Sequence, residues 1–140
     1  MPRIISFAWT TPALLAGVKT VTRRDWNARY AQQFAAGEVV LAYDRNPRYG
    51  GKPVARIALT ERPYLESTRD APPADFAAEG FEYLEARGAK VDKLSPRTLW
   101  RAWKLEPRDM WVVRFEVLEL LEAAPAPPPQ REGQQGALEL

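Results

Sequence analysis

Two apolar segments separated by a short polar loop constrain the fold of this chain more than any other feature. Residues 38–43 are mostly apolar, and residues 53–60 alternate between two sets of side chains with the period of two that a strand requires. The loop between them, residues 44–52, contains Asn-Pro and Gly-Gly pairs, which are typical of turns. We therefore expect the two segments to form strands that pair antiparallel.

The other segments predict a mixture of short strands and short helices. Further strands are expected where β-branched and apolar side chains dominate, namely over residues 4–7, 19–24 and 111–120. Helices are expected at four places, namely residues 12–16 with Thr11 as the cap, part of 27–34, 75–88 and 97–105. This order favours an α+β domain, most simply a small curled sheet or barrel with helices at its ends.

Length and composition indicate one domain followed by a tail. A chain of 140 residues, of which 46% are hydrophobic, fits a single core. We assign residues 1–122 to this domain and residues 123–140, which are rich in Pro, Gln and Gly, to a polar tail. No apolar run approaches the roughly 20 residues that cross a bilayer, and the N-terminus does not resemble a secretory signal. The expected location is the cytoplasm, without a membrane partner.

The absence of cysteine and histidine narrows the chemistry that this chain can perform. It excludes thiol nucleophiles, catalytic triads built on imidazole, and zinc sites built from these two residues. Proton transfer must pass through lysine, glutamate, aspartate or tyrosine. We expect a protein with neither a metal ion nor another cofactor.

Positive charge is concentrated in the first half of the chain. Residues 1–62 contain ten lysines and arginines against four acids, a net charge of +6, whereas residues 63–140 carry −4. The densest cluster lies in residues 17–26 and includes Lys19, Arg23 and Arg24. Because local positive potential attracts phosphates, this half is the candidate for binding a nucleic acid or another anion.

The same cluster carries a resemblance to a known family. Residues 15–24 read Leu-Ala-Gly-Val-Lys-Thr-Val-Thr-Arg-Arg, which resembles the G-x-K-x-x-T/E-x-R signature of the ASCH family. The order of a turn and strand, an acidic helix segment and a final strand also matches, at residues 37–40, 78–81 and 111–116. The resemblance covers roughly residues 4–120 and implies a PUA-like small β-barrel.

The resemblance implies two kinds of function. ASCH and PUA-like domains are regarded as RNA-binding modules, and one bacterial group that resembles this motif hydrolyses N4-acetylcytidine to cytidine and acetate. The catalytic residues of that group correspond by motif position to Lys19, Thr22 and Glu79. Under this interpretation, Thr22 attacks the acetyl carbonyl, Lys19 takes its proton, and Lys19 or Arg24 stabilises the oxyanion. Glu79 manages the proton on the departing amino group.

The spacing of Lys19 and Thr22 places a condition on the geometry. In a regular strand over residues 19–24 the two side chains would point to opposite faces, because side chains alternate with a period of two. Lys19 must lie in a turn before the strand, or a bulge must rotate it, if the two are to share a site. We expect Lys19, Thr22 and Glu79 to point into one concavity. We also expect burial and the neighbouring arginines to lower the pKa of Lys19, with any nearby carboxylate opposing that shift.

Aromatic and basic side chains supply candidate contacts to RNA. Trp26 directly follows Arg-Arg-Asp and can stack on a base or cap the cleft. The loop of residues 43–51 interleaves aromatic side chains with arginines, namely Tyr43, Arg45, Arg48 and Tyr49. This pattern is suited to binding single-stranded RNA. We assign the indoles of Trp9, Trp100 and Trp103 to the core.

Three functions follow from these observations. The first is an RNA- or nucleotide-binding domain with a basic cleft formed by Lys19, Arg23, Arg24, Trp26, Arg45 and Arg48. The second is a small metal-independent amidohydrolase acting on an acylated nucleoside, or a ribonuclease. The third is an interaction domain that docks a protein partner through its basic half and its tail. An enclosed pocket around Lys19 and Thr22 would favour hydrolysis, whereas groups spread over an open surface would favour docking.

Overall fold

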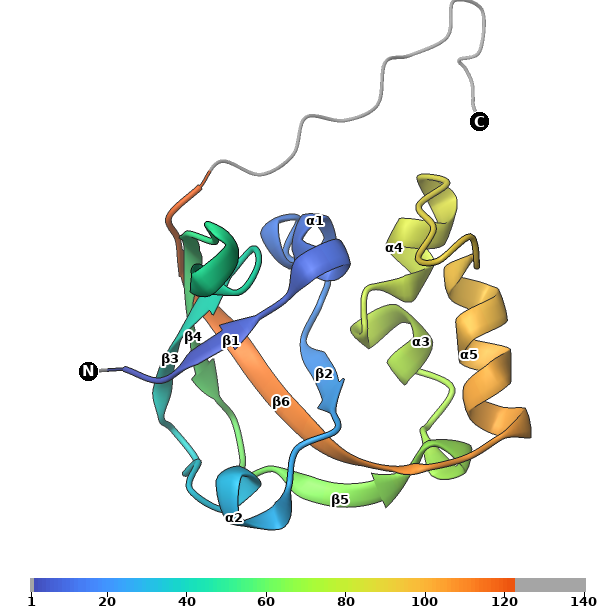
Figure 1. The fold of residues 1–140 in the computed structure, drawn as a ribbon, viewed down its shortest axis with the longest axis horizontal. Coiled ribbons are helices and arrows are strands. Elements are labelled where there is room, and N and C mark those ends of the chain that lie inside the picture. Colours follow the sequence, from blue (N-terminus) through green and yellow to red (C-terminus); the bar gives the residue numbers. More distant parts are fainter. Residues whose placement is uncertain (1, 123–140) are drawn as a thin grey trace, which may run out of the picture.

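A computed structural model describes residues 2–122, and the predicted tail of residues 123–140 lies outside the described residues. A curled, mostly antiparallel sheet forms a half-barrel (Figure 1). On one side of it lie three helices, α3 (Asp75–Ala78), α4 (Phe81–Ala86) and α5 (Pro96–Leu105). The expected α+β fold, a small, curled and mostly antiparallel sheet accompanied by a few helices, is confirmed.

Within residues 2–122, six strands make up the sheet. They are β1 (Ile4–Ser6), β2 (Val21–Arg24), β3 (Val39–Tyr43), β4 (Pro53–Leu59), β5 (Tyr64–Ser67) and β6 (Asp109–Leu120). Their order is β1-β3-β4-β6-β2, with β5 also pairing with β6. The expected antiparallel pairing of β3 with β4 is confirmed, whereas β1 pairs with β3 in parallel. Strand β5 was not expected from the sequence.

The long strand β6 joins the two parts of the curl. Its first half pairs with both β2 and β5, with Thr22 opposite Val113, and its second half pairs with β4, with Leu59 opposite Phe115. The pairing of β4 with β6 contains a register shift between Arg56 and Ile57. Such irregularities bend a strand locally. β6 thereby brings β2 next to the helical side of the molecule.

The short helices differ from expectation at two points. Thr10 rather than Thr11 occupies the N-cap of α1 (Thr11–Leu15). The expected helix over 75–88 is divided into α3 and α4, because Gly80 has a φ of 88°, a left-handed conformation that interrupts a helix. A single helical turn, α2 (Ala28–Ala31), and three 3₁₀ turns complete the fold: η1 (Ala8–Thr10), η2 (Pro47–Tyr49) and η3 (Thr68–Asp70). Among the described helices, none has the length and apolar character needed to cross a membrane.

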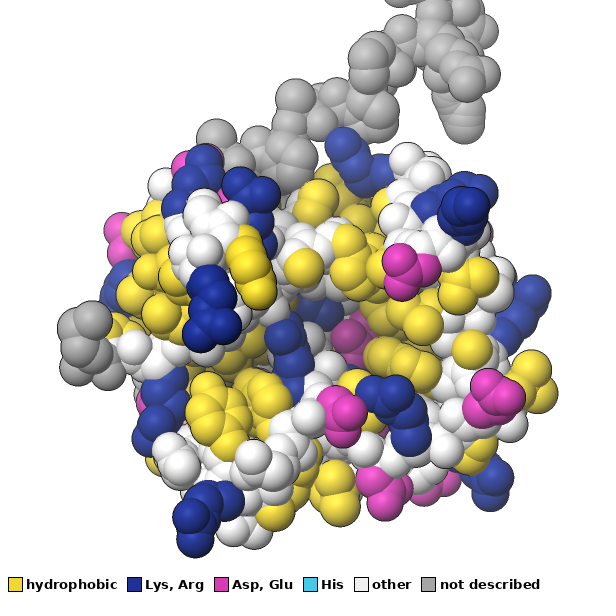
Figure 2. All heavy atoms as spheres, viewed as in Figure 1, with side chains coloured by type: hydrophobic (Ala, Val, Ile, Leu, Met, Phe, Trp, Pro, Cys, Tyr) yellow, Lys and Arg dark blue, Asp and Glu magenta, His cyan; other side chains and the backbone are white. Residues whose placement is uncertain are grey.

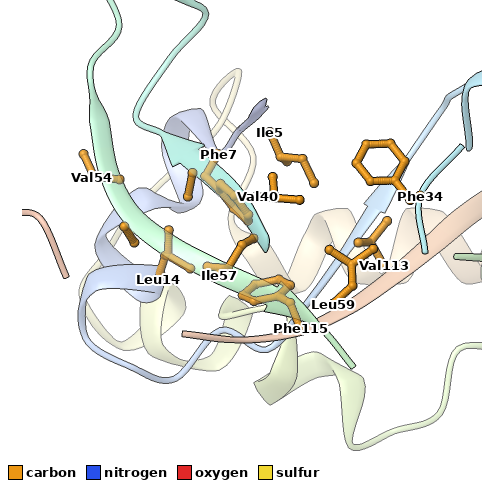
Figure 3. Close-up of a cluster of buried hydrophobic side chains, with 12 residues drawn as sticks. Ile5, Phe7, Leu14, Phe34, Val40, Val54, Ile57, Leu59, Val113 and Phe115 are labelled. Carbon is orange, nitrogen blue, oxygen red and sulfur yellow. The ribbon is translucent and has the colours of Figure 1, made fainter. Parts of the chain in front are cut away.

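The hydrophobic core fills the inside of the curl (Figure 3). Alternate residues of β4, including Ile57 and Leu59, point inward, as their period of two predicted. Phe7 meets Phe115 edge to face, with ring centroids 5.6 Å apart. The core contains Ile5 of β1 and Phe7, the residue that follows β1, so this segment is anchored against the inside of the curl.

Candidate functional site

A cavity of about 250 Å³ lies between η1, β2 and the helices α4 and α5, with Glu79, at the end of α3, also in its lining. Figure 2 shows this face hollowed near its middle, where basic and acidic side chains lie close together. Residues predicted from the sequence that line the cavity are Lys19, Thr22, Arg23, Arg24 and Glu79. Within residues 2–122, no three acidic side chains are grouped so as to hold a metal ion.

Lys19 lies in the turn before β2 and not in the strand. The backbone N–H of Lys19 donates to the carbonyl of Ala13, and that of Thr20 donates to the carbonyl of Ala78, so α1 and α3 hold this turn. β2 begins only at Val21. This placement removes the strand alternation that would have separated Lys19 from Thr22, and both side chains line the cavity.

The Lys19 amine is buried against Glu79. Its Nζ donates to the backbone carbonyl of Glu79 at 2.8 Å and to Glu79 Oε1 at 3.1 Å, and only 1% of Lys19 is exposed. Burial lowers the pKa of Lys19, while the carboxylate of Glu79 opposes this shift. Lys19 is therefore closer than an ordinary lysine to losing its proton at neutral pH.

Gly80 allows Glu79 to approach Lys19. A Cβ at position 80 would lie 2.5 Å from the Cβ of Ala13 and 3.5 Å from that of Lys19. Glu79 ends α3, and the left-handed conformation of Gly80 then turns the chain into α4. Close packing of α3 against α1 and the Lys19 turn thus depends on the absence of a side chain here.

Arg23 is held by three carboxylates. Its Nη1 donates to Glu79 Oε2 at 2.7 Å, and its Nη2 donates to Asp75 Oδ2 at 2.6 Å and to Glu66 Oε1 at 3.0 Å. Burial alone would lower the pKa of Arg23, but these carboxylates outweigh it and raise the pKa. Arg23 is a buried structural charge that fixes the second oxygen of Glu79.

A second arginine continues this network away from the cavity. Arg114 binds Asp75 through both Nη atoms, at 3.1 and 2.8 Å, and its Nε donates to the Tyr64 hydroxyl at 3.1 Å. Burial would raise the pKa of Asp75, but the two arginines lower it. β2, α3, β5 and β6 are therefore tied together by one ionic network, which we call the paired charge network: Lys19, Arg23, Glu66, Asp75, Glu79 and Arg114.

Arg24, the next residue on β2, has a different environment. Its Nε donates to Thr22 Oγ1 at 3.2 Å, and its guanidinium carbon lies 5.3 Å from the centre of the Phe7 ring. Among residues 2–122, no carboxylate is within ion-pair distance of it. Burial lowers the pKa of Arg24 to about 10, because the charged form loses hydration, and the carboxylate of Glu79, which forms no ion pair with Arg24, only partly opposes this shift.

Aromatic side chains form the opposite wall of the cavity. Trp9 stacks on Phe81 with ring centroids 5.6 Å apart, and Trp103 lies 5.4 Å from the same ring. Trp9, Phe81 and Trp103 all line the cavity. This corrects the assignment of Trp9 and Trp103 to the core, because their packing against Phe81 leaves part of each indole at the cavity.

The structure does not bring the other predicted contact residues to the cavity. Trp26 stacks on Phe34, with centroids 4.8 Å apart and planes 6° apart, and packs against the core. This corrects the expectation that its indole caps the cleft. The remaining four residues lie in the segment of β3 and η2 and do not line the cavity: Tyr43, Arg45, Arg48 and Tyr49. Tyr49 is 70% exposed.

Three residues of the network were missed in the sequence: Glu66, Asp75 and Arg114. Asp75 precedes Glu79 by four residues, which places both carboxylates on one face of α3. That spacing was a usable signal, although Asp75 was interpreted only as a residue that begins a helix. Glu66 and Arg114 lie on strands whose sequences indicate no such partnership.

Comparison with known proteins identifies no family for this chain. No protein-family model and no curated protein matches this chain. One similar solved structure is the crystal structure of protein EF3133 from Enterococcus faecalis V583, which carries the family description DUF984. The two chains are 21% identical over 86% of this chain and 82% of that one, with a TM-score of 0.48. Function must therefore be argued from the residues of this chain.

Proposed function

We propose that this chain is a member of the ASCH family, and that its cavity binds an N4-acylated cytidine and hydrolyses the amide. One observation carries the proposal: Lys19, Thr22 and Glu79 line the same cavity. Its volume of about 250 Å³ is just below the range of roughly 300–1,000 Å³ that is usual for ligand pockets. That size suits a nucleoside better than an oligonucleotide, and the indoles of Trp9 and Trp103 provide apolar surface for a base.

Thr22 supplies the nucleophile in this proposal. Its Oγ1 accepts a hydrogen bond from Arg24, so its own O–H remains available to donate to a base. A threonine hydroxyl becomes an effective nucleophile only when a base takes its proton. Lys19 takes that proton in its neutral form, which its lowered pKa makes more accessible.

Acyl transfer then proceeds in two steps. Oγ1 of Thr22 bonds to the acyl carbon, and Arg24 stabilises the charge that develops on the acyl oxygen. The bond from the acyl carbon to N4 breaks, and N4 receives the proton from Lys19 by way of Glu79, which is hydrogen-bonded to the amine. Water then adds to the acyl carbon, the bond to Oγ1 breaks and Thr22 regains a proton. The released acid loses its own proton to solvent and leaves as a carboxylate, so Lys19 is neutral again for the next turnover.

The test is incubation of the purified protein with N4-acetylcytidine, with cytidine and acetate measured by mass spectrometry. Thr22→Val should abolish product formation, because it removes the nucleophile while keeping the shape of the side chain. Thr20→Val is the matched control, since Thr20 is an exposed threonine of the same segment. Failure of the unaltered protein to form cytidine would refute the proposal. Cleavage of an RNA pool in the same assay would instead support a ribonuclease.

RNA contact is a second candidate function, and the exposed loop around η2 favours it. Arg45 and Arg48 are exposed beside Tyr49, which suits phosphate contacts combined with stacking on a base. This surface lies outside the cavity lining, so RNA binding there and hydrolysis in the cavity are separable functions. Docking of a protein partner through the basic motif is less favoured, because Lys19 and Thr22 are enclosed and not spread over an open surface.

A further inference from the structure

The charges around the cavity do not balance within residues 2–122. Four cations and three carboxylates are buried or partly buried there: Lys19, Arg23, Arg24 and Arg114 against Glu66, Asp75 and Glu79. Every one of these carboxylates binds a cation other than Arg24. Asp25 also lines the cavity, but 78% of its side chain is exposed and it pairs with Arg108 at 3.5 Å. The uncompensated charge is that of Arg24.

The guanidinium of Arg24 has hydrogen-bond donors to spare. Its Nε bonds to Thr22 Oγ1, and among the described residues neither of its Nη atoms has an acceptor. The ring of Phe7, 5.3 Å from the guanidinium carbon, restricts how the planar group can turn. A partly buried cation without an anion is unfavourable, so this position favours any negatively charged group that enters the cavity.

We propose that Arg24 binds a carboxylate of the ligand, namely the small carboxylate that amide hydrolysis releases. The source of this carboxylate rests on the proposed function, but the binding can be measured without turnover. The bond from Arg24 Nε to Thr22 Oγ1 places the guanidinium beside the atom that carries the acyl group. When water cleaves that ester, a neutral acyl group becomes a carboxylate within reach of both Nη atoms.

The geometry of the two groups supports this choice of ligand. Two parallel N–H groups of a guanidinium match the two oxygens of a carboxylate, and such bidentate pairs are stronger than neutral hydrogen bonds. Lys19 and Arg23 are the other cations that line the cavity, but Glu79 already accepts two hydrogen bonds from Lys19, and carboxylates already accept from both Nη atoms of Arg23. Acetate should therefore occupy the acyl position of the empty site and compete with the acylated nucleoside.

The experiment is a nuclear magnetic resonance titration of the full chain at constant ionic strength, following the arginine Nε–H resonances. Sodium acetate is compared with sodium phosphate and sodium chloride. The Arg24 resonance should shift saturably with acetate and should not shift with chloride. Arg24→Gln should weaken acetate binding by about tenfold or more, because a charge-assisted pair is removed. Arg48→Gln, at an exposed arginine outside the cavity lining, is the matched control and should bind acetate normally.

Each outcome decides the proposal. Acetate that fails to bind, or that binds Arg24→Gln as tightly as the unaltered protein, overturns it. Phosphate binding tighter than acetate also overturns it and indicates a nucleotide phosphate at Arg24. If Arg24→Gln does not fold, the Arg24 resonance of the unaltered protein still reports whether acetate binds there. Acetate binding without hydrolysis of N4-acetylcytidine would refute the proposed function alone, and hydrolysis without acetate binding would refute this inference alone.

Discussion

Arg23 and Arg24 are adjacent on β2, but only the side chain of Arg23 is surrounded by carboxylates. Arg23 contacts three carboxylates and belongs to the paired charge network. Arg24 faces the cavity without a carboxylate partner among the described residues. The comparison teaches that a basic motif does not present all of its charges to a ligand. One arginine is paired with carboxylates inside the protein, and the other is the one that we propose binds a ligand.

The two arginines should therefore differ most in their effect on stability. Arg23→Ala leaves buried carboxylates without their cation, and breaking a buried ion pair in this way costs about 3–5 kcal/mol. Arg24→Ala breaks no protein ion pair among residues 2–122 and should change the free energy of unfolding by about 1 kcal/mol or less. Urea denaturation followed by tryptophan fluorescence measures both variants. Equal decreases in the free energy of unfolding of the two variants would show that Arg23 and Arg24 do not differ in their structural role.

The paired charge network should also influence the pKa of Lys19. Glu79 raises the pKa of Lys19 against the effect of burial, so Glu79→Gln should lower that pKa further. The neutral amine would then appear at lower pH. Titration of the labelled lysine side chains by nuclear magnetic resonance measures the shift. Glu82→Gln is the control, since Glu82 is exposed on α4 and should leave the Lys19 titration unchanged.

A smaller effect should mark the far end of the network. Tyr64→Phe removes the hydroxyl that accepts from Arg114 Nε, and removal of one such hydrogen bond costs about 1 kcal/mol. Chemical denaturation provides the measurement, and Tyr49→Phe, which alters an exposed ring, should cost nothing measurable. A Tyr64→Phe variant as stable as the unaltered protein would limit the network to the groups nearer the cavity.

The exposed arginines should show the smallest effects, limited to RNA binding. Arg45→Ala or Arg48→Ala should each leave stability unchanged and flatten the salt dependence of single-stranded RNA binding by about 0.7 for each phosphate that the arginine would otherwise neutralise. Fluorescence anisotropy of a labelled RNA at several salt concentrations tests this. If neither substitution changes RNA binding, the loop around η2 does not contact RNA, and Arg24 is left as the candidate for binding anions.

Local sequence patterns predicted much of the fold. The alternation in residues 53–60 and the turn residues before it identified β3, β4 and their antiparallel pairing. The parallel pairing of β1 with β3 and the addition of β5 to β6 depend on contacts between distant segments, for which local patterns hold no signal. Gly80 was visible in the sequence, but whether a glycine interrupts a helix depends on the packing around it, here against Ala13.

The cavity was predicted in part. The period of a strand was enough to require that Lys19 precede β2, and the structure places it there. Trp9 and Trp103 were assigned to the core but line the cavity, whereas Trp26 was predicted to stack on a base or cap the cleft but packs on Phe34. An indole suits both a core and a cavity wall, so its place is decided by its neighbours in space and not by its neighbours in sequence.

The contact between Lys19 and Glu79 joins residues that are 60 positions apart, and Arg23 and Asp75 are 52 apart. Closing such loops is entropically unfavourable and is offset only once both segments have docked. The cavity is therefore absent from an unfolded chain, and a ligand that binds it selects the folded state. A ligand at a hundred times its dissociation constant would raise the free energy of unfolding by about 2.7 kcal/mol. A rise in melting temperature is thus a measure of binding at this cavity that does not depend on turnover.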